Sequence, residues 1–207
     1  MKQLIIFLLV LTSFRLSAQT NDLKPVKDTF DNYKKAILKS DGKEAAKWVD
    51  KKTFVYYGKM LAMTLKADSA EVAALPLMDR LTVLSLRHRV PMEDIASLDG
   101  KQLFIYSIDQ GMVGKNSVAN VEIGEVVVNG NSASGQLVAN GEESPLYFKF
   151  NKEDGQWKLD LTSLFGPTTE GLQKMLVDQG MTENQFIFQA LEMMTGKPVS
   201  DKIWSPE

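Results

Sequence analysis

Apolar residues recur every three or four positions in the first part of the chain, which is the period of an amphipathic helix. One stripe runs through residues 25–40 and consists of Val26, Phe30, Tyr33 and Ile37. The same spacing predicts a helix over residues 53–65. Pro76 and Pro91 are expected to divide and then end the helix that follows, because proline has no backbone N–H to donate.

Three pairs of residues have the form of a capping box, in which a short polar side chain begins a helix and Glu or Gln follows three residues later. They are Asp41 with Glu44, Asp68 with Glu71, and Thr182 with Gln185. Each pair therefore predicts the first residue of a helix.

Residues 99–111 fit two structures. Asp99 and Gly111 suit the two ends of a helix, whereas the apolar run Leu103-Phe104-Ile105-Tyr106 also suits a buried strand. We favour the helix.

The period changes to two between residues 121 and 162, which indicates β-strands. Four apolar segments alternate with turn residues, and these turns are Asn129-Gly130, Asn140-Gly141 and Lys152-Glu153-Asp154-Gly155. Tight turns between successive strands produce an antiparallel meander. Its one apolar face needs a cover, and the N-terminal helices are the candidates.

The helical period returns after Gly166-Pro167 and continues to Gly196. The predicted fold class is therefore α+β, with N-terminal helices packed on a curved four-stranded antiparallel meander and a helical extension at the C-terminus. No internal repeat or linker is visible, so residues 19–207 are predicted to form a single domain.

The N-terminus has the three parts of a secretory signal peptide. Lys2 supplies the positive charge, residues 4–11 are apolar but too few to span a bilayer, and Ala18 is a small residue before the expected cut. Cleavage after Ala18 leaves 189 of the 207 residues. We therefore expect an exported protein, periplasmic or secreted, with an uncleaved membrane anchor as the alternative.

Composition narrows the partners and cofactors. The chain has 24 basic and 26 acidic residues without a basic run, so neither nucleic acid nor, after cleavage, a membrane is an expected partner. A single His and no Cys do not suit a dedicated zinc or iron site. No phosphate-binding loop, dinucleotide fingerprint or nucleophile elbow is present, so no metal and no cofactor are predicted.

The first helix, the Asp41-Gly42 break and the strand over residues 155–161 are similar to elements of the nuclear transport factor 2-like superfamily. That superfamily includes ketosteroid isomerase-like and scytalone dehydratase-like enzymes. The resemblance implies a cone-shaped sheet whose mouth holds a small apolar ligand. The sequence departs from the family in two places: residues 53–111 read mostly as helix, and the extension from Thr168 is not part of the common cone. None of the family's catalytic residues aligns with this chain.

Two residues are candidates for acid–base chemistry. His88, the single histidine, shares a helical face with Leu81 and Leu84 and is either a general base or a helix-end residue that contacts carbonyls. Asp160 lies on the strand of Trp157 but on the opposite face, where it is either a pocket base or a solvated residue. The structural alternative is favoured for both.

Other side chains are candidates for binding. Tyr57 and Tyr147 could donate hydrogen bonds to a ligand, although aromatic residues in such segments are more often core. The methionines around Met193-Met194 are interpreted as core rather than as an adaptable surface. Glu122 and Glu125 are three apart, so they face opposite sides of a regular strand and form no carboxylate pair unless a bulge intervenes.

Three functional hypotheses follow. The first is a non-catalytic binding module, with a cone-shaped pocket or sheet face for a small apolar molecule or a protein partner. The second is an isomerase- or dehydratase-like enzyme that uses acid–base residues inside the cone. The third is a structural or assembly protein that forms a homodimer through the open sheet face. The lack of an acid–base constellation favours the first.

Overall fold

The computed structural model describes residues 22–206. The predicted signal peptide, residues 1–18, lies outside the described residues, so export and cleavage stay predictions. No helix within residues 22–206 is both long and apolar enough to cross a membrane.

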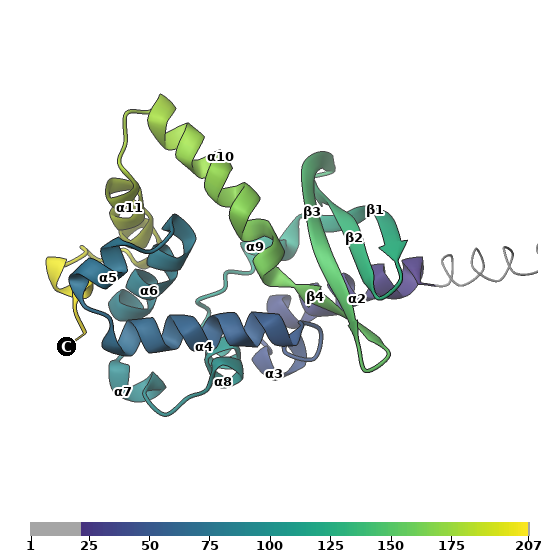
Figure 1. Cartoon of the computed structure of the whole chain (residues 1–207), viewed down its shortest axis with the longest axis horizontal. Helices are drawn as coiled ribbons and strands as arrows, with labels where there is room; N and C mark the ends of the chain where they lie inside the picture. Colours follow the sequence, from purple (N-terminus) through teal and green to yellow (C-terminus); the bar gives the residue numbers. More distant parts are fainter. Residues whose placement is uncertain (1–21, 207) are drawn as a thin grey trace, which may run out of the picture. The chain divides into compact units, whose positions relative to one another are not determined.

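The order of elements confirms the predicted α+β fold class (Figure 1). The helices before the sheet are α2 (Leu23–Leu38), α3 (Gly42–Ala45), α4 (Lys51–Lys66), α5 (Ser69–Ala73), α6 (Leu77–Arg89), α7 (Met92–Ile95), α8 (Gly100–Asp109) and α9 (Asn116–Ala119). The strands are β1 (Val121–Asn129), β2 (Ser132–Ala139), β3 (Glu142–Glu153) and β4 (Gln156–Asp160). The elements after the sheet are the 3₁₀ turn η1 (Leu161–Leu164), α10 (Phe165–Asp178), α11 (Glu183–Thr195) and the 3₁₀ turn η2 (Asp201–Trp204).

Contacts group the chain into two compact units. The sheet unit contains residues 22–50 and 107–163, and the helical unit contains residues 51–106 and 164–206. Each unit is built from two separate stretches of chain. The prediction of a single domain over residues 19–207 stays a prediction.

The four strands form a sheet in the order β1-β2-β3-β4, with every neighbouring pair antiparallel, as the turn signals predict (Figure 1). The second and third hairpins turn at Asn140-Gly141 and Asp154-Gly155, where both residues have positive φ. This is the geometry of a type I′ turn. The first hairpin differs from the prediction by one position. Asn129 still pairs with Ser132, and the turn begins at Gly130, whose φ is 60°.

Helix α2 covers the apolar face of the sheet. The rings of Phe30 and Phe148 have centroids 5.3 Å apart, and Phe150 and Leu159 are fully buried. The Asp22 carboxylate, just before α2, accepts hydrogen bonds from Trp157 Nε1 (3.0 Å) and Lys152 Nζ (2.9 Å). These bonds hold the pKa of Asp22 below its usual value. The inner side of the sheet is thus filled by side chains of α2 and of the strands themselves.

The two edge strands of the sheet differ: β4 pairs with a further segment of the chain, whereas β1 is interrupted by a bulge. The edge at β4 is extended by residues 48–50, because Leu159 N donates to Trp48 O (2.8 Å) and Asp50 N donates to Leu159 O (3.0 Å). The edge at β1 carries a bulge between Ile123 and Val126. Bulges are one device by which proteins keep an edge strand from pairing with another chain.

The helical predictions hold with small shifts at the ends. Residues 99–111 contain α8, so the helix is confirmed over the strand, and Leu103 and Phe104 are fully buried. The capping boxes at Asp68 and Thr182 are complete. The box at Asp41 is half formed: Asp41 Oδ1 accepts from Glu44 N (2.9 Å), but the Glu44 carboxylate binds Lys47 and Trp48 instead of returning to Asp41.

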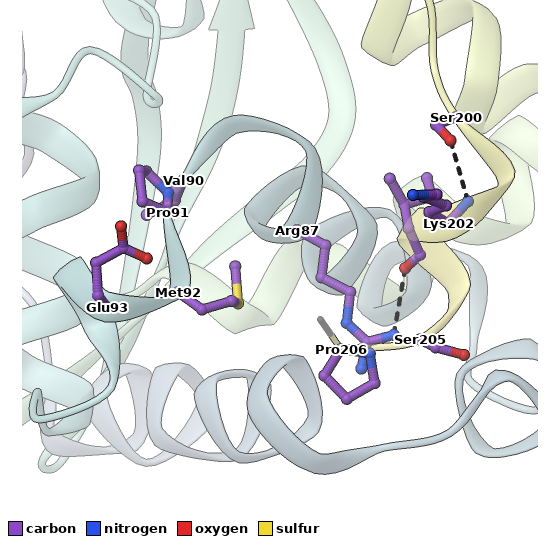
Figure 2. Close-up of a pocket in the computed structure, with 10 residues that line it drawn as sticks. Arg87, Val90, Pro91, Met92, Glu93, Ser200, Lys202, Ser205 and Pro206 are labelled. Carbon is purple, nitrogen blue, oxygen red and sulfur yellow. Dashed lines mark hydrogen bonds between the residues drawn. The ribbon is translucent and has the colours of Figure 1, made fainter.

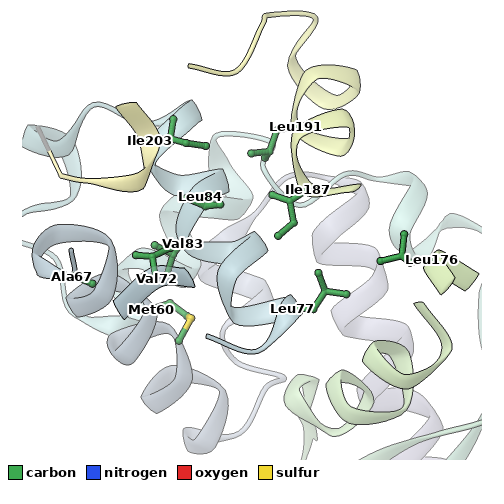
Figure 3. Packing of buried hydrophobic residues seen from close by; sticks show 10 residues of the cluster. All are labelled: Met60, Ala67, Val72, Leu77, Val83, Leu84, Leu176, Ile187, Leu191 and Ile203. Atoms are coloured by element: carbon green, nitrogen blue, oxygen red, sulfur yellow. The ribbon is translucent and has the colours of Figure 1, made fainter. Parts of the chain in front are cut away.

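The helical unit has its own core (Figure 3). Fully or nearly fully buried aliphatic side chains come from α4, α5, α6, α10, α11 and η2, and they are Met60, Val72, Leu77, Val83, Leu84, Leu176, Ile187, Leu191 and Ile203. Burial of side chains of this size is the main source of stability for a unit without disulfides.

Helices α4 and α8 approach each other at two glycines. A Cβ on Gly100 would lie 2.6 Å from Gly58 N and would also collide with the carbonyl oxygen of Phe54. A Cβ on Gly58 would instead make an ordinary contact, 3.8 Å from Gly100 Cα. Glycine is therefore required at position 100 and not at position 58.

We expect Gly100→Ala to lower the free energy of unfolding by about 3 kcal/mol, because backbone atoms must move apart to admit the methyl group. The matched control is Gly58→Ala, which places alanine in a helix interior and should leave stability unchanged or raise it by up to about 1 kcal/mol. Urea unfolding followed by circular dichroism measures both. Equal effects of the two variants would contradict the close approach.

Candidate functional site

His88 makes a hydrogen bond between two helices of the helical unit. It lies in the last turn of α6, partly buried, and its Nε2 is 3.1 Å from the hydroxyl of Thr195. That hydroxyl donates to Leu191 O (2.8 Å), so it accepts from the imidazole. His88 therefore joins the end of α6 to the end of α11. The partner is a hydroxyl rather than the carbonyls expected from the sequence.

Asp160 is not a solvated strand residue, as its position on the strand suggested. It is only 4 % exposed, and its Oδ1 accepts from Thr162 N (2.9 Å) and from Thr162 Oγ1 (2.6 Å). An aspartate that accepts from the backbone two residues later stabilises a turn. Asp160 thus ends β4 and begins η1.

The two candidate tyrosines differ in environment. Tyr57, on α4, packs edge-on against Phe104 with ring centroids 5.2 Å apart, and burial raises the pKa of its hydroxyl to about 12. Tyr147, on β3, is 38 % exposed on the outward face of the sheet. His88 and Tyr57 belong to the helical unit, whereas Asp160 and Tyr147 belong to the sheet unit, so neither unit brings the four candidates together.

The bulge in β1 changes the relation of the two glutamates. Ile123 and Val126 both pair with residues of the covered face, so one extra residue separates them and the alternation restarts. Glu122 and Glu125 therefore share the outward face, because the bulge that the prediction allowed as the exception is present. Both are exposed, and charged side chains on an edge strand discourage pairing with another chain.

The methionines near the end of α11 are not core. Met193 is 83 % exposed and Met194 is 58 % exposed. The buried residues of α11 are Ile187, Ala190 and Leu191. The core interpretation of this pair is wrong.

Arg87, on α6, holds three parts of the helical unit together through backbone carbonyls. At the end of α4 its guanidinium donates to Thr64 O (2.9 Å), Met63 O (3.0 Å) and Ala67 O (2.6 Å). In η2 it donates to Ile203 O (3.2 Å) and Trp204 O (2.7 Å). These five hydrogen bonds use the guanidinium fork and attach the C-terminal tail to the helices.

A hollow of about 310 Å³ lies beside Arg87, between the α6–α7 junction and the tail (Figure 2). Its lining includes Arg87, Glu93, Lys202 and Ser205 together with apolar groups from Pro91 and Met92. The guanidinium is already bound to carbonyls. The other charged side chains of the lining are those of Glu93 and Lys202, which are exposed and carry opposite charges.

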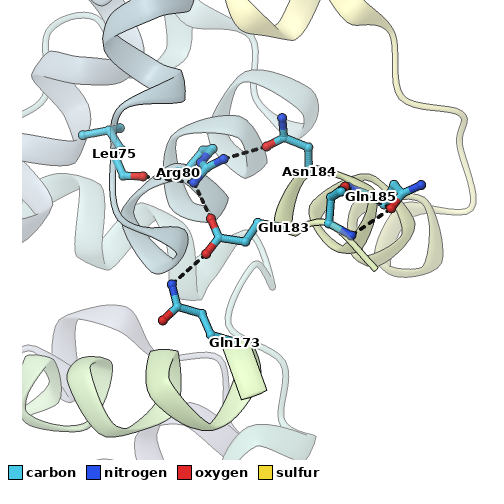
Figure 4. Close-up of polar contacts among 7 residues, drawn as sticks. Leu75, Arg80, Gln173, Glu183, Asn184 and Gln185 are labelled. Carbon is cyan, nitrogen blue, oxygen red and sulfur yellow. Dashed lines mark hydrogen bonds and ion pairs between the residues drawn. The ribbon is translucent and has the colours of Figure 1, made fainter. Parts of the chain in front are cut away.

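A second arginine, Arg80, fixes the beginning of α11 (Figure 4). Its Nη2 pairs with Glu183 Oε2 at 2.5 Å, and its Nη1 donates to Asn184 Oδ1 at 2.7 Å. Gln173 of α10 donates to the other oxygen of Glu183 at 2.7 Å. The first turn of α11 is thus held by α6 and α10.

Between these two anchored elements lies a second hollow, of about 430 Å³, which we call the aromatic hollow. Its lining is Asn184, Gln185, Phe188 and Gln189 of α11 with Asp201 and Trp204 of η2. The rings of Phe188 and Trp204 are partly exposed, with centroids 6.1 Å apart and planes inclined by 34°. Its volume falls within the ~300–1,000 Å³ range of small-ligand sites.

The polar groups of the aromatic hollow are largely uncommitted. Among the hydrogen bonds and ion pairs of residues 22–206, none engages the side chains of Gln189 and Asp201 or the indole N–H of Trp204. Asn184 and Gln185 use their carbonyl oxygens within the protein and keep their NH₂ groups. Donors and acceptors thus remain for a ligand.

The sheet unit has a hollow of about 370 Å³ between α2 and β1. Three lysines and two acidic residues line it, and Lys34 already donates to Val121 O (2.9 Å). The mixed charges and the bulged edge give it no distinct ligand chemistry. Within residues 22–206, no group of three His, Cys, Asp or Glu side chains is placed to hold a metal ion.

Sequence reasoning missed the aromatic hollow. It gave Phe188, Gln189 and Trp204 no role in binding. A signal was present: Asn184, Gln185, Phe188 and Gln189 are spaced for one helical face, with amides around an aromatic ring. No family model, curated protein or solved structure matches the chain. The likeness to the nuclear transport factor 2-like superfamily stays a prediction.

We expect Arg87→Lys to lower the free energy of unfolding by about 2–4 kcal/mol. Lysine has one donor atom and cannot replace a fork that reaches five carbonyls, which leaves some of them buried without a partner. The matched control is Lys66→Ala, which removes a charge from the same end of α4 and should cost less than about 1 kcal/mol. Thermal and urea unfolding measure both. Because Arg87→Lys keeps the positive charge, a loss below about 1 kcal/mol for this variant, no larger than that of Lys66→Ala, would contradict the importance of the hydrogen-bonded fork.

Proposed function

We propose that the protein is an exported, non-catalytic binding module whose ligand binds in the aromatic hollow of the helical unit. The proposal rests on one contrast: the acid–base candidates are hydrogen-bonded within the protein, whereas polar groups at the rim of the aromatic hollow have no partner in the described part of the chain. His88 and Asp160 are bound to Thr195 and Thr162, whereas the side chains of Gln189 and Asp201 at the rim of the aromatic hollow have no partner within residues 22–206. Binding sites characteristically combine an apolar floor with a few polar groups that fix orientation.

The rigid support of the hollow favours the same function. Phe188 projects from a helix whose first turn is held by Arg80, and Trp204 sits in a turn held by Arg87. A preorganised site avoids the entropic cost of ordering side chains when a ligand binds. This support distinguishes the hollow from the exposed pair Met193 and Met194.

The proposal moves the ligand from the place expected from the sequence. The inner side of the sheet is packed by α2, with Phe30 against Phe148, so the expected mouth of a cone is filled at that position. Formation of a homodimer through the sheet stays a prediction.

An NMR screen of a fragment library tests the proposal, because the three tryptophans report separately. The indole N–H of Trp48 donates to Glu44 (3.1 Å) and that of Trp157 donates to Asp22 (3.0 Å), but that of Trp204 is free. We expect fragments that bind to shift the Trp204 indole resonance and to leave the other two in place. Trp204→Phe assigns the resonance.

A library in which no fragment moves the Trp204 resonance, or in which binders move only Trp48 or Trp157, would contradict binding in the aromatic hollow.

A further inference from the structure

The rim of the aromatic hollow selects against charged ligands. Its polar side chains are three amides and one carboxylate, and no Lys or Arg lines it. An anion would meet Asp201 without a compensating cation. Amides both donate and accept hydrogen bonds, as hydroxyl groups do. The complementary ligand is therefore uncharged and carries several hydroxyl groups.

The floor of the hollow adds a second requirement. Phe188 and Trp204 present two neighbouring aromatic rings, which pack against flat or gently curved apolar surfaces. A pyranose ring has such a surface in its C–H face, and its hydroxyl groups project around the edge. A sugar that lies on the two rings would direct hydroxyls toward Asn184, Gln189 and Asp201 at the rim.

We infer that the aromatic hollow is a binding site for a neutral carbohydrate. Trp204 and Phe188 form the platform, while Gln189 and Asp201 bind hydroxyl groups. The inference rests on the proposed function, because it names the ligand class of the same hollow. Its openness to solvent suits the end or side of a longer saccharide as well as a disaccharide.

An alkylammonium cation is the rival ligand, because cations also bind aromatic faces and carboxylates. Asp201 is the single carboxylate in the lining. A cation without hydroxyl groups or other acceptors would pair with Asp201 alone and make no hydrogen bond to the NH₂ groups of the rim amides, whereas a sugar would use both. We therefore favour the sugar, and choline serves as the probe for the rival.

Isothermal titration calorimetry of the mature chain tests the inference, with three kinds of probe. They are neutral disaccharides of glucose, mannose, galactose and N-acetylglucosamine, an acidic disaccharide of galacturonate, and choline. We expect at least one neutral disaccharide to bind and the other two kinds to fail. Trp204→Ala and Phe188→Ala should each weaken binding by about tenfold or more, as truncation of aromatic anchors generally does.

Gln189→Ala keeps the test valid if an aromatic variant unfolds, because Gln189 is exposed and its side chain takes part in no hydrogen bond or ion pair within residues 22–206. It should weaken sugar binding by about threefold or more with an unchanged melting temperature. The matched control is Met193→Ala, an exposed position on the same helix outside the hollow, which should bind as the wild type does.

The outcomes separate the inference from the proposed function. If fragments or choline shift the Trp204 resonance but no neutral disaccharide binds, the carbohydrate inference is wrong and the binding function stands. If sugars bind to Trp204→Ala and to Gln189→Ala as tightly as to the wild type, the site is elsewhere and the inference is wrong. If no sugar, fragment or choline reaches Trp204, both fail.

Discussion

One partly buried interaction holds the elements of the helical unit in place, the contact of the Arg87 guanidinium with backbone carbonyls. The last carbonyls of a helix have no partner within the helix, and those at the end of α4 point toward α6. Arg87 satisfies them and extends to Ile203 and Trp204, so a single side chain caps a helix and attaches the tail. Burial lowers its pKa without removing its charge at physiological pH. The position of η2 follows from this contact.

The aromatic hollow is a consequence of that arrangement. Because η2 is fixed by its carbonyls, its side chains are directed to two sides: Ile203 enters the core and Trp204 lies beside Phe188. Arg80 fixes α11 in the same way through Glu183. The two arginines are thus bound within the protein, and the aromatic rings, the amides and Asp201 remain for binding. The acid–base candidates predicted from the sequence, His88 and Asp160, therefore do not lie in the proposed site.

Local patterns predicted the elements well and the site poorly. The period of two, the turns at Asn140-Gly141 and Asp154-Gly155 and the capping boxes at Asp68 and Thr182 depend on neighbouring residues, and the structure confirms them. The errors came where long-range contacts decide. The exposure of Met193 and the partners of Arg87 depend on segments 20 or more residues away. Asp160 is the exception, because its carboxylate accepts from Thr162 where the strand ends. The aromatic hollow is lined by α11 and η2, so it could be predicted only after the position of the C-terminal tail was known.

The central claim is that Arg87 holds the tail in place before any ligand binds. Hydrogen–deuterium exchange of the ligand-free protein tests it most directly, through the amides of Ile203 and Ser205, which donate within the tail turn at 3.1 and 3.2 Å. The account predicts that these amides are protected and that they exchange with the interior of α11 as one cooperative unit. Exchange of the tail at the rate of an unstructured peptide, with α11 still protected, would contradict a preformed site.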